Sequence, residues 1–165
     1  MAGIERRIEK LVPIMQRRVK AFLNQCAAEN IKVAILETVR SEDIQKAYYA
    51  QGREHIEDVN ELRRKAGLYE ISEKENKNII TNCDGVTHKS NHQARADGYG
   101  YAVDIAPVDN KGRVLWNAPQ SVWEHIGKIA EDCGLDWCAG GRGAIWGKGW
   151  DSPHFELPAD DIFKD

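Results

Sequence analysis

The spacing of apolar residues predicts a helix and then a strand at the beginning of the chain. From Ile4 to Leu23, apolar residues recur every three or four positions, which is the period of one face of an α-helix, and the pattern runs through Pro13. The stretch 31–39 is rich in β-branched residues that alternate in side, which favours a strand ended by Arg40. We therefore expect one amphipathic helix followed by a strand.

The middle of the chain predicts a second helix, a polar excursion and two further strands. Ser41 is a suitable N-cap for a helix whose first turn is acidic and which stops at Gly52. The stretch 57–78 is polar and poorly periodic, which indicates a surface excursion with room for a short helix. Strands are expected at 79–81 and 101–108, with a loop between them.

The C-terminal part predicts one more helix and two short strands. Ser121 begins a helix with the sequence of a capping box, and Gly134 is its stop signal. Strands are expected at 135–138 and 154–157. The glycine-rich stretch 139–153 between them predicts a loop. It is not a phosphate-binding loop, because no Gly-Lys-Ser/Thr sequence follows the glycines.

The order of these elements favours an α+β fold. N-terminal helices precede a small, mainly antiparallel sheet that is crossed by one helix. The length of 165 residues fits a single domain over 1–165, and we find no linker or repeat. Four cysteines lie far apart without a Cys-x-x-Cys pair, so we interpret them as free thiols, most of them buried.

Charge and hydropathy exclude several kinds of partner. The net charge of -3 gives no basic surface for nucleic acid. The N-terminus alternates charged and apolar residues, so it lacks the apolar run of a signal peptide or a membrane span. We expect a monomer that is made in the cytoplasm, does not insert stably into membranes, and reaches any target outside the membrane only after release.

Residues that can hold a metal concentrate in two segments, 90–107 and 146–157. A catalytic zinc uses three protein ligands and leaves a fourth position for water. His92, Asp104 and His154 supply such a set, with Asp104 in a predicted strand and the histidines at loop–strand junctions. Two histidines and an aspartate are not specific by themselves, so a zinc site needs further support.

That support is a resemblance carried by three ordered motifs. They are Tyr49-Ala50-Gln51-Gly52-Arg53, then Ser90-x-His92 followed by Gly100-x-Ala102-x-Asp104, and last Asp151-x-x-His154-x-Glu156. In this order they resemble the zinc peptidases that include D-Ala-D-Ala carboxypeptidases, vancomycin-resistance dipeptidases and phage L-alanyl-D-glutamate endopeptidases. The resemblance runs from about residue 30 to the C-terminus, and three ordered motifs are more specific than any one of them.

The resemblance implies a role for each matching residue. The implied zinc ligands are His92, Asp104 and His154. Asp151 is implied as the general acid and base, and Arg53 as the cation that steadies the carbonyl oxygen. Ser90 is implied as a substrate contact. We interpret Glu156 as a partner that orients a neighbouring ligand.

One spacing departs from the family pattern and leaves a second ligand possible. The family has His-x-x-Gly-x-Ala-x-Asp, whereas here residues 93–99 separate His92 from Gly100. Asp97 is therefore a rival to Asp104, which keeps the Gly-x-Ala-x-Asp context within a strand-like sequence. We prefer Asp104.

The resemblance implies hydrolysis of an amide bond in peptidoglycan stem peptides. Among the activities of the family we favour that of an L-alanyl-D-glutamate endopeptidase acting as a phage endolysin, because the chain is short and shows no export signal or anchor. The alternatives are a D-Ala-D-Ala carboxypeptidase or dipeptidase, and a wall-binding module that has lost the chemistry.

Overall fold

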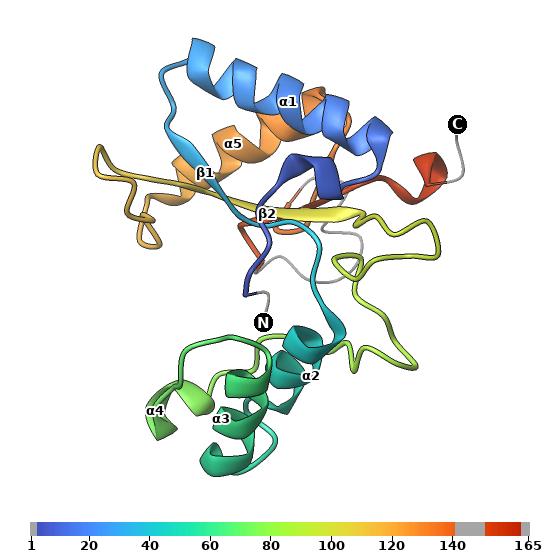
Figure 1. Ribbon diagram of the computed structural model, residues 1–165. Helices are drawn as coiled ribbons and strands as arrows, with labels where there is room; N and C mark the ends of the chain where they lie inside the picture. Colours follow the sequence, from blue (N-terminus) through green and yellow to red (C-terminus); the bar gives the residue numbers. More distant parts are fainter. Residues whose placement is uncertain (1–2, 141–150, 163–165) are drawn as a thin grey trace.

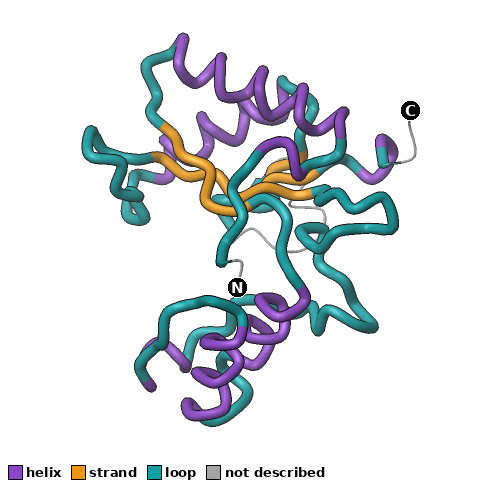
Figure 2. Tube along the Cα trace, viewed as in Figure 1, coloured by secondary structure: helices purple, strands orange, loops and turns teal. Residues whose placement is uncertain are grey.

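The computed structural model describes residues 3–140 and 151–162. Its helices are η1 (Ile8–Lys10), α1 (Pro13–Ala28), α2 (Glu42–Ala50), α3 (Ile56–Lys65), α4 (Glu73–Asn76), α5 (Gln120–Asp132) and η3 (Ala159–Asp161). Its strands are β1 (Val33–Glu37), β2 (Ala102–Pro107), β3 (Asp136–Trp137) and β4 (His154–Glu156). Figure 2 shows the helices and strands in separate colours.

The four strands form one antiparallel sheet in the order β1-β2-β4-β3. The long helices α1 and α5 lie together on one side of this sheet, and α2, α3 and α4 lie on the other (Figure 1). This arrangement confirms the α+β fold and the antiparallel sheet. The extent of the domain, 1–165, stays a prediction.

The main core lies between the sheet and the layer of α1 and α5. Met15, Val19 and Phe22 on α1 are completely buried, as is Ile126 on α5. The ring of Phe22 packs against that of Phe155 on β4, with 5.4 Å between the centroids. Full burial of each such side chain stabilises the fold by about 1.5–3 kcal/mol, so this layer anchors β4 and the residues beside it.

Trp137 on β3 connects α5 to the segment that precedes β4. A Cβ atom at Gly127 of α5 would lie 2.3 Å from the indole of Trp137, so only glycine allows this close approach. The indole Nε1 donates a hydrogen bond to the carbonyl of Ser152, at 2.8 Å. The position of Trp137 therefore fixes how the chain enters β4.

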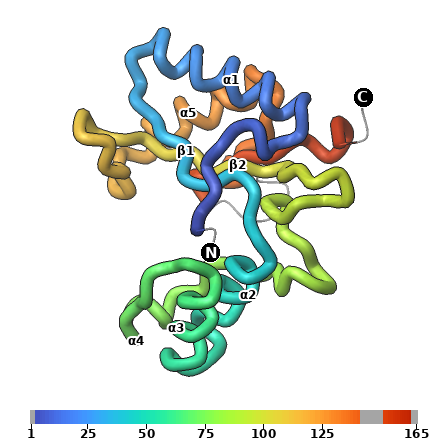
Figure 3. Tube along the Cα trace, viewed as in Figure 1, coloured from blue at the N-terminus to red at the C-terminus, as the bar shows by residue number. Residues whose placement is uncertain are grey.

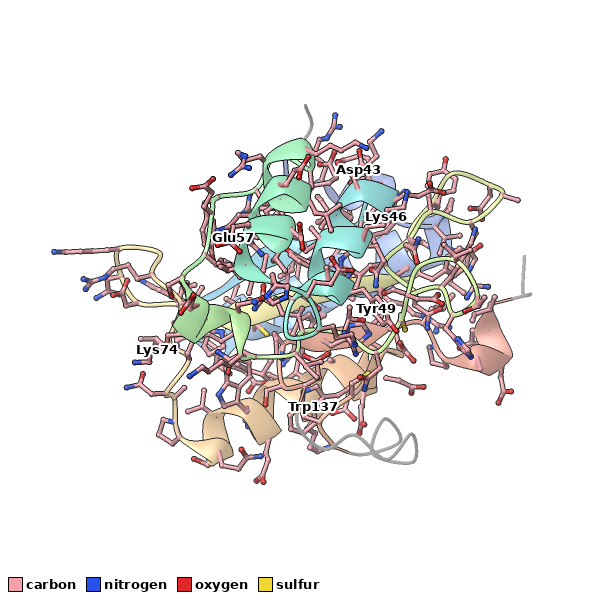
Figure 4. The ribbon with its side chains drawn as sticks, turned by 90° about the horizontal axis from the view of Figure 1, so that it is seen from below. Asp43, Lys46, Tyr49, Glu57, Lys74 and Trp137 are labelled. Atoms are coloured by element: carbon pink, nitrogen blue, oxygen red, sulfur yellow. The ribbon has the colours of Figure 1, made fainter. Side chains whose placement is uncertain are left out.

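The helices on the other side of the sheet form a small lobe with its own apolar cluster. Ile44 and Ala47 of α2 pack with Ala66 and Leu68 at the end of α3. Figure 4 looks onto this lobe from below, with Asp43, Lys46 and Tyr49 labelled on α2 and Glu57 on α3. The N-terminal segment passes between the sheet and the lobe (Figure 3), and Ile4 packs against the lobe's cluster.

Several sequence predictions of elements are confirmed. Ser41 caps α2, because its side chain accepts a hydrogen bond from the backbone N–H of Ile44. Strands lie within the predicted stretches 31–39, 101–108, 135–138 and 154–157, each shorter than expected. All four cysteines are free, although only Cys26 is buried.

Other predictions of elements are wrong. The first helix does not run through Pro13 but begins there, because proline lacks the N–H that a helix interior needs and fits a first turn. Residues 79–81 form no strand, and none of the strands in the described part of the chain pairs with them. Helix α5 begins at Gln120, and its N-cap is Pro119, so Ser121 makes no capping box.

The stretch 57–78 is more ordered than its periodicity suggested, since it contains most of α3 and all of α4. Most of the predicted glycine-rich loop, residues 141–150, lies outside the described residues. Among the described residues, we find no helix with the length and hydropathy required to cross a bilayer.

Candidate metal centre

Three of the predicted site residues meet where β2 and β4 pair. Asp104 of β2 and His154 of β4 are directly opposite each other in the antiparallel register, so their side chains share one face of the sheet. His92 reaches the same place from the loop before β2. Its backbone carbonyl accepts the N–H of Arg40 at 2.8 Å, and its ring Nδ1 bonds to the carbonyl of Thr38 at 2.8 Å.

The three side chains place one donor atom each at the corners of a small triangle. His92 Nε2 lies 3.1 Å from Asp104 Oδ1 and 3.1 Å from His154 Nδ1, and the latter two atoms are 3.3 Å apart. Three nitrogen and oxygen ligands held about 2.0–2.1 Å from a tetrahedral zinc lie roughly 3.3 Å from one another. The observed triangle therefore fits the donor set and the size of such a centre.

Each histidine is oriented by a second hydrogen bond. The Nδ1–H of His92 donates to the Thr38 carbonyl, which leaves Nε2 free to bind a metal. The Nε2 of His154 bonds to Glu156 Oε2 at 3.0 Å, and Asn91 Nδ2 donates to the same oxygen at 3.0 Å. Glu156 thus lies where we expected an orienting residue.

Close packing of these groups shifts their proton affinities in opposite directions. Burial alone would raise the pKa of Asp104, but the adjacent His92 and His154 hold it well below its usual range. Burial would lower the pKa of His154, yet hydrogen bonds with Asp104, Cys138 and Glu156 raise it well above its usual value. The cluster thus attracts positive charge, which a proton or a metal ion can supply.

The triangle faces a pocket of about 450 Å³. Among the residues that line this pocket are Arg40, Ser90, His92, Asp104, Asp151 and His154. Asp151 is half-buried, its Oδ2 lies 4.0 Å from His154 Nδ1, and burial raises the pKa of its carboxyl group. A carboxyl group beside a candidate metal position can take up and return a proton during a reaction.

Ser90 lines the pocket but also supports the loop that carries His92. Its Oγ accepts the backbone N–H of His92 at 3.2 Å, and its own backbone N–H donates to Gln93 Oε1 at 2.9 Å. The side chain of Gln93 in turn donates to the carbonyl of Gly85. Ser90 is therefore placed both to touch a substrate and to position a ligand.

The structure places Asp97 apart from the triangle. Its carboxylate accepts hydrogen bonds from the hydroxyl of Tyr101 and the backbone N–H of Tyr99. Asp97 does not line the pocket. The strand register places Asp104 opposite His154, and it is Asp104, and not Asp97, that contacts His92.

Arg53 does not line the pocket either. Its guanidinium stacks over the ring of Tyr49 at 4.0 Å, donates to the Tyr49 carbonyl at 2.6 Å, and contacts Asn82 Oδ1 at 3.3 Å. Asn82 itself lines the pocket, so Arg53 is adjacent to the pocket rim through this contact. An oxyanion in the pocket would therefore need Arg53 to leave these partners.

Among the residues that the structure describes, Arg40 is the arginine that lines the pocket, and it was not predicted as a site residue from the sequence. It is 7% exposed and is held by two bonds to Glu37, at 3.0 and 2.6 Å, and one to Gln45 Oε1 at 3.0 Å. The signal for it was the pairing of β1 with β2, which places Glu37 opposite Asp104 and brings Arg40 close to the same site. That pairing could not be deduced from sequence spacing.

Comparison with known proteins adds independent information. No protein-family model matches the chain. In sequence it is similar to the peptidoglycan L-alanyl-D-glutamate endopeptidase CwlK of Bacillus subtilis, with 28% identity over 154 residues, which cover 89% of this chain and 73% of that protein.

Two solved structures show a similar fold. One is the L-Ala D-Glu endopeptidase ChiX of Serratia marcescens, with a TM-score of 0.50, 17% identity, and coverage of 97% of this chain and 90% of that one. The other is the vancomycin resistance D,D-pentapeptidase VanY, solved in complex with Zn(II), with a TM-score of 0.54, 15% identity, and coverage of 89% and 72%. The sequence relative and the shared fold confirm the resemblance of this chain to the zinc D-Ala-D-Ala carboxypeptidase and L-alanyl-D-glutamate peptidase family.

Proposed function

We propose that this protein is a zinc-dependent peptidase that hydrolyses an amide bond in the stem peptides of peptidoglycan. The observation that carries the proposal is the triangle of His92 Nε2, Asp104 Oδ1 and His154 Nδ1, with edges of 3.1–3.3 Å, at the wall of a pocket that also contains Asp151. The similarity to CwlK, ChiX and VanY supports the same chemistry.

We propose His92, Asp104 and His154 as the zinc ligands. A zinc ion bound there would supply Lewis acidity toward the scissile carbonyl and would lower the pKa of a water molecule. Thr38 and Glu156 keep the two imidazoles in the tautomers that present Nε2 and Nδ1 to the ion.

Asp151 is proposed to move the proton. Its carboxylate removes a proton from the attacking water and then delivers it to the amine that leaves. The position of Oδ2, 4.0 Å from His154 Nδ1, supports this role, as does a pKa raised by burial. Ser90, on the same wall, is proposed to contact the substrate.

For the cation that stabilises the carbonyl oxygen, the geometry favours Arg40 over Arg53. Bonds to Glu37 and Gln45 use three of the five guanidinium N–H donors of Arg40, so two remain for a substrate oxygen among the described contacts. A guanidinium held in this way needs no reorganisation during the reaction, which is the condition for effective oxyanion stabilisation.

We propose the bond between L-alanine and D-glutamate as the bond that is cleaved, because two of the similar proteins carry that activity in their names. Release of a terminal D-alanine is the alternative, supported by the likeness to VanY structures, one of which contains D-Alanine-D-Alanine. Action as a phage endolysin, on the cell wall after release, stays a prediction.

The test is digestion of purified peptidoglycan by the zinc-loaded protein, followed by identification of the new chain ends. The proposal expects new amino termini on D-glutamate. Release of free D-alanine without new amino termini on D-glutamate would establish the carboxypeptidase alternative. Binding to the wall with neither product would show a wall-binding module and overturn the proposal. The Asp104→Ala variant is the matched control and should release nothing.

A further inference from the structure

A second group of metal-binding atoms lies on the other side of His154. Cys138 Sγ, a nitrogen of His154 and a carboxylate oxygen of Glu156 all lie within 4.8 Å of one another. Cys138 directly follows β3, and its backbone N–H donates to the carbonyl of His154 at 3.1 Å. These contacts tie the thiol to the strand that carries the other two donors, so the group is part of the ordered sheet.

The carboxylates of the two groups face opposite nitrogens of the same imidazole. Nδ1 of His154 faces Asp104 at 3.3 Å, and Nε2 faces Glu156 at 3.0 Å. In one tautomer Nδ1 is free for a metal while Nε2–H donates to Glu156. In the other, Nε2 is free while Nδ1–H points to Asp104. A carboxylate lies on each side of the ring and can accept the N–H of either nitrogen. Both tautomers are therefore stabilised without rotation of the ring.

We propose that Cys138, His154 Nε2 and Glu156 form a second cation site, for a thiophilic divalent ion such as Cd²⁺. A thiolate with one imidazole and one carboxylate is a softer donor set than the His92, Asp104 and His154 triangle, and soft sulfur ligands favour such ions. On binding, the thiol and the Nε2 of His154 each release a proton to solvent, and the ring keeps its proton on Nδ1, which points to Asp104.

The site has a consequence for the proposed zinc centre. His154 can offer only one neutral nitrogen at a time, so an ion at Cys138 removes a ligand from the triangle. The two sites therefore exclude each other, and a thiophilic ion displaces zinc without touching His92 or Asp104. This inference concerns metal binding alone and does not depend on the proposed hydrolysis.

The test is ultraviolet absorption of the metal-free protein during titration with Cd²⁺. A sulfur-to-cadmium charge-transfer band should grow to one equivalent. Cys138→Ser should abolish the band and weaken Cd²⁺ binding by at least about a hundredfold, since even the loss of a residue that only orients a ligand costs roughly 10–100-fold. Asp104→Asn should keep the band, because Asp104 belongs only to the triangle.

Cys83 provides the matched control, because this cysteine lines the same pocket as Cys138 but belongs to neither of the two groups of metal-binding atoms. Cys83→Ser should keep the full band. The proposal is overturned if no band forms, if the band survives in Cys138→Ser, or if Cys83→Ser or Asp104→Asn removes it.

Discussion

The Nε2 atom of His92 lies 3.1 Å from the Nδ1 atom of His154, although the two residues are 62 positions apart in the chain. Two imidazole nitrogens at this distance can share one proton or one metal ion. Asp104 completes the contact with both rings at 3.1 and 3.3 Å. The three residues thus form one unit, and substitution of any one of them should have the same effect, which is loss of the metal.

The choice of aspartate ligand gives the first prediction. Asp104→Ala should remove zinc, because it deletes one corner of the triangle, whereas Asp97→Ala should keep one zinc per chain. Metal analysis of the two purified proteins is the measurement, with circular dichroism to show that both are folded. Loss of zinc from the Asp97 variant alone would mean that the loop at 93–99 rearranges when metal binds.

The identity of this aspartate shows what the sequence could and could not provide. The Gly-x-Ala-x-Asp context and the strand-like sequence around Asp104 were sufficient to choose it. The sequence could not show why the longer loop at 93–99 is tolerated, because the reason is a set of contacts with residues that are distant in the chain. Gln93 bonds to Gly85, and the carbonyl of His92 bonds to Arg40, so both hold the loop independently of its length.

The second prediction concerns Asp151. Asp151→Asn should keep zinc and the fold, because the amide is nearly isosteric and the triangle is untouched. The rate of stem-peptide hydrolysis should fall by about two to four orders of magnitude, since an amide cannot carry the proton. Rate measurements on zinc-saturated variants check this. A normal rate would transfer the role to another carboxylate, with Glu156 first to be examined.

The third prediction separates the two arginines. Arg40→Lys should keep zinc but lower the rate by roughly a hundredfold or more, because lysine lacks the fork of donors that the guanidinium presents. Lysine is chosen because removing the charge would leave Glu37 buried without a partner, at a cost of about 3–5 kcal/mol. Hydrolysis rates are compared with those of Arg53→Ala.

If Arg40 is the cation that stabilises the carbonyl oxygen of the substrate, Arg53→Ala should change the rate of hydrolysis only slightly. The opposite ranking of the two variants would restore the role that the sequence motif implied for Arg53. The motif could not rank them, because it contains Arg53 but not Arg40. The contacts of Arg40 with Glu37 and of Arg53 with Tyr49 are seen only in the structure.

The fourth prediction concerns the support of β4. Gly127→Ala should destabilise the protein by about 1–3 kcal/mol or more, because its Cβ would lie 2.3 Å from the anchored indole of Trp137. This penalty should exceed the gain of about 1 kcal/mol in helix propensity. The exposed substitution Glu124→Ala in the same helix should stay within about 0.5 kcal/mol. Urea unfolding measures both, and a more stable Gly127 variant would contradict this packing.

Prediction from sequence succeeded for several local signals and failed most clearly where distant contacts determine the structure. Ser41 caps its helix as its neighbours in sequence indicate. Ile79 and Ile80 have the composition of a strand but are 52% and 37% exposed, and no strand of the described residues pairs with them. From the sequence, Arg40 was interpreted only as the end of a strand. Its bond to Gln45 and the pairing of β1 with β2, which brings Arg40 close to Asp104, could not be read from sequence spacing.

The most direct test of the zinc centre is titration of the metal-free protein with zinc while the hydrolysis of stem peptides is followed. The rate should be negligible without metal, rise in proportion to added zinc and level off at one equivalent per chain. His92→Ala, Asp104→Ala and His154→Ala should each remain inactive over the same titration. Full activity in the metal-free protein, or an active variant at any of the three positions, would contradict the account.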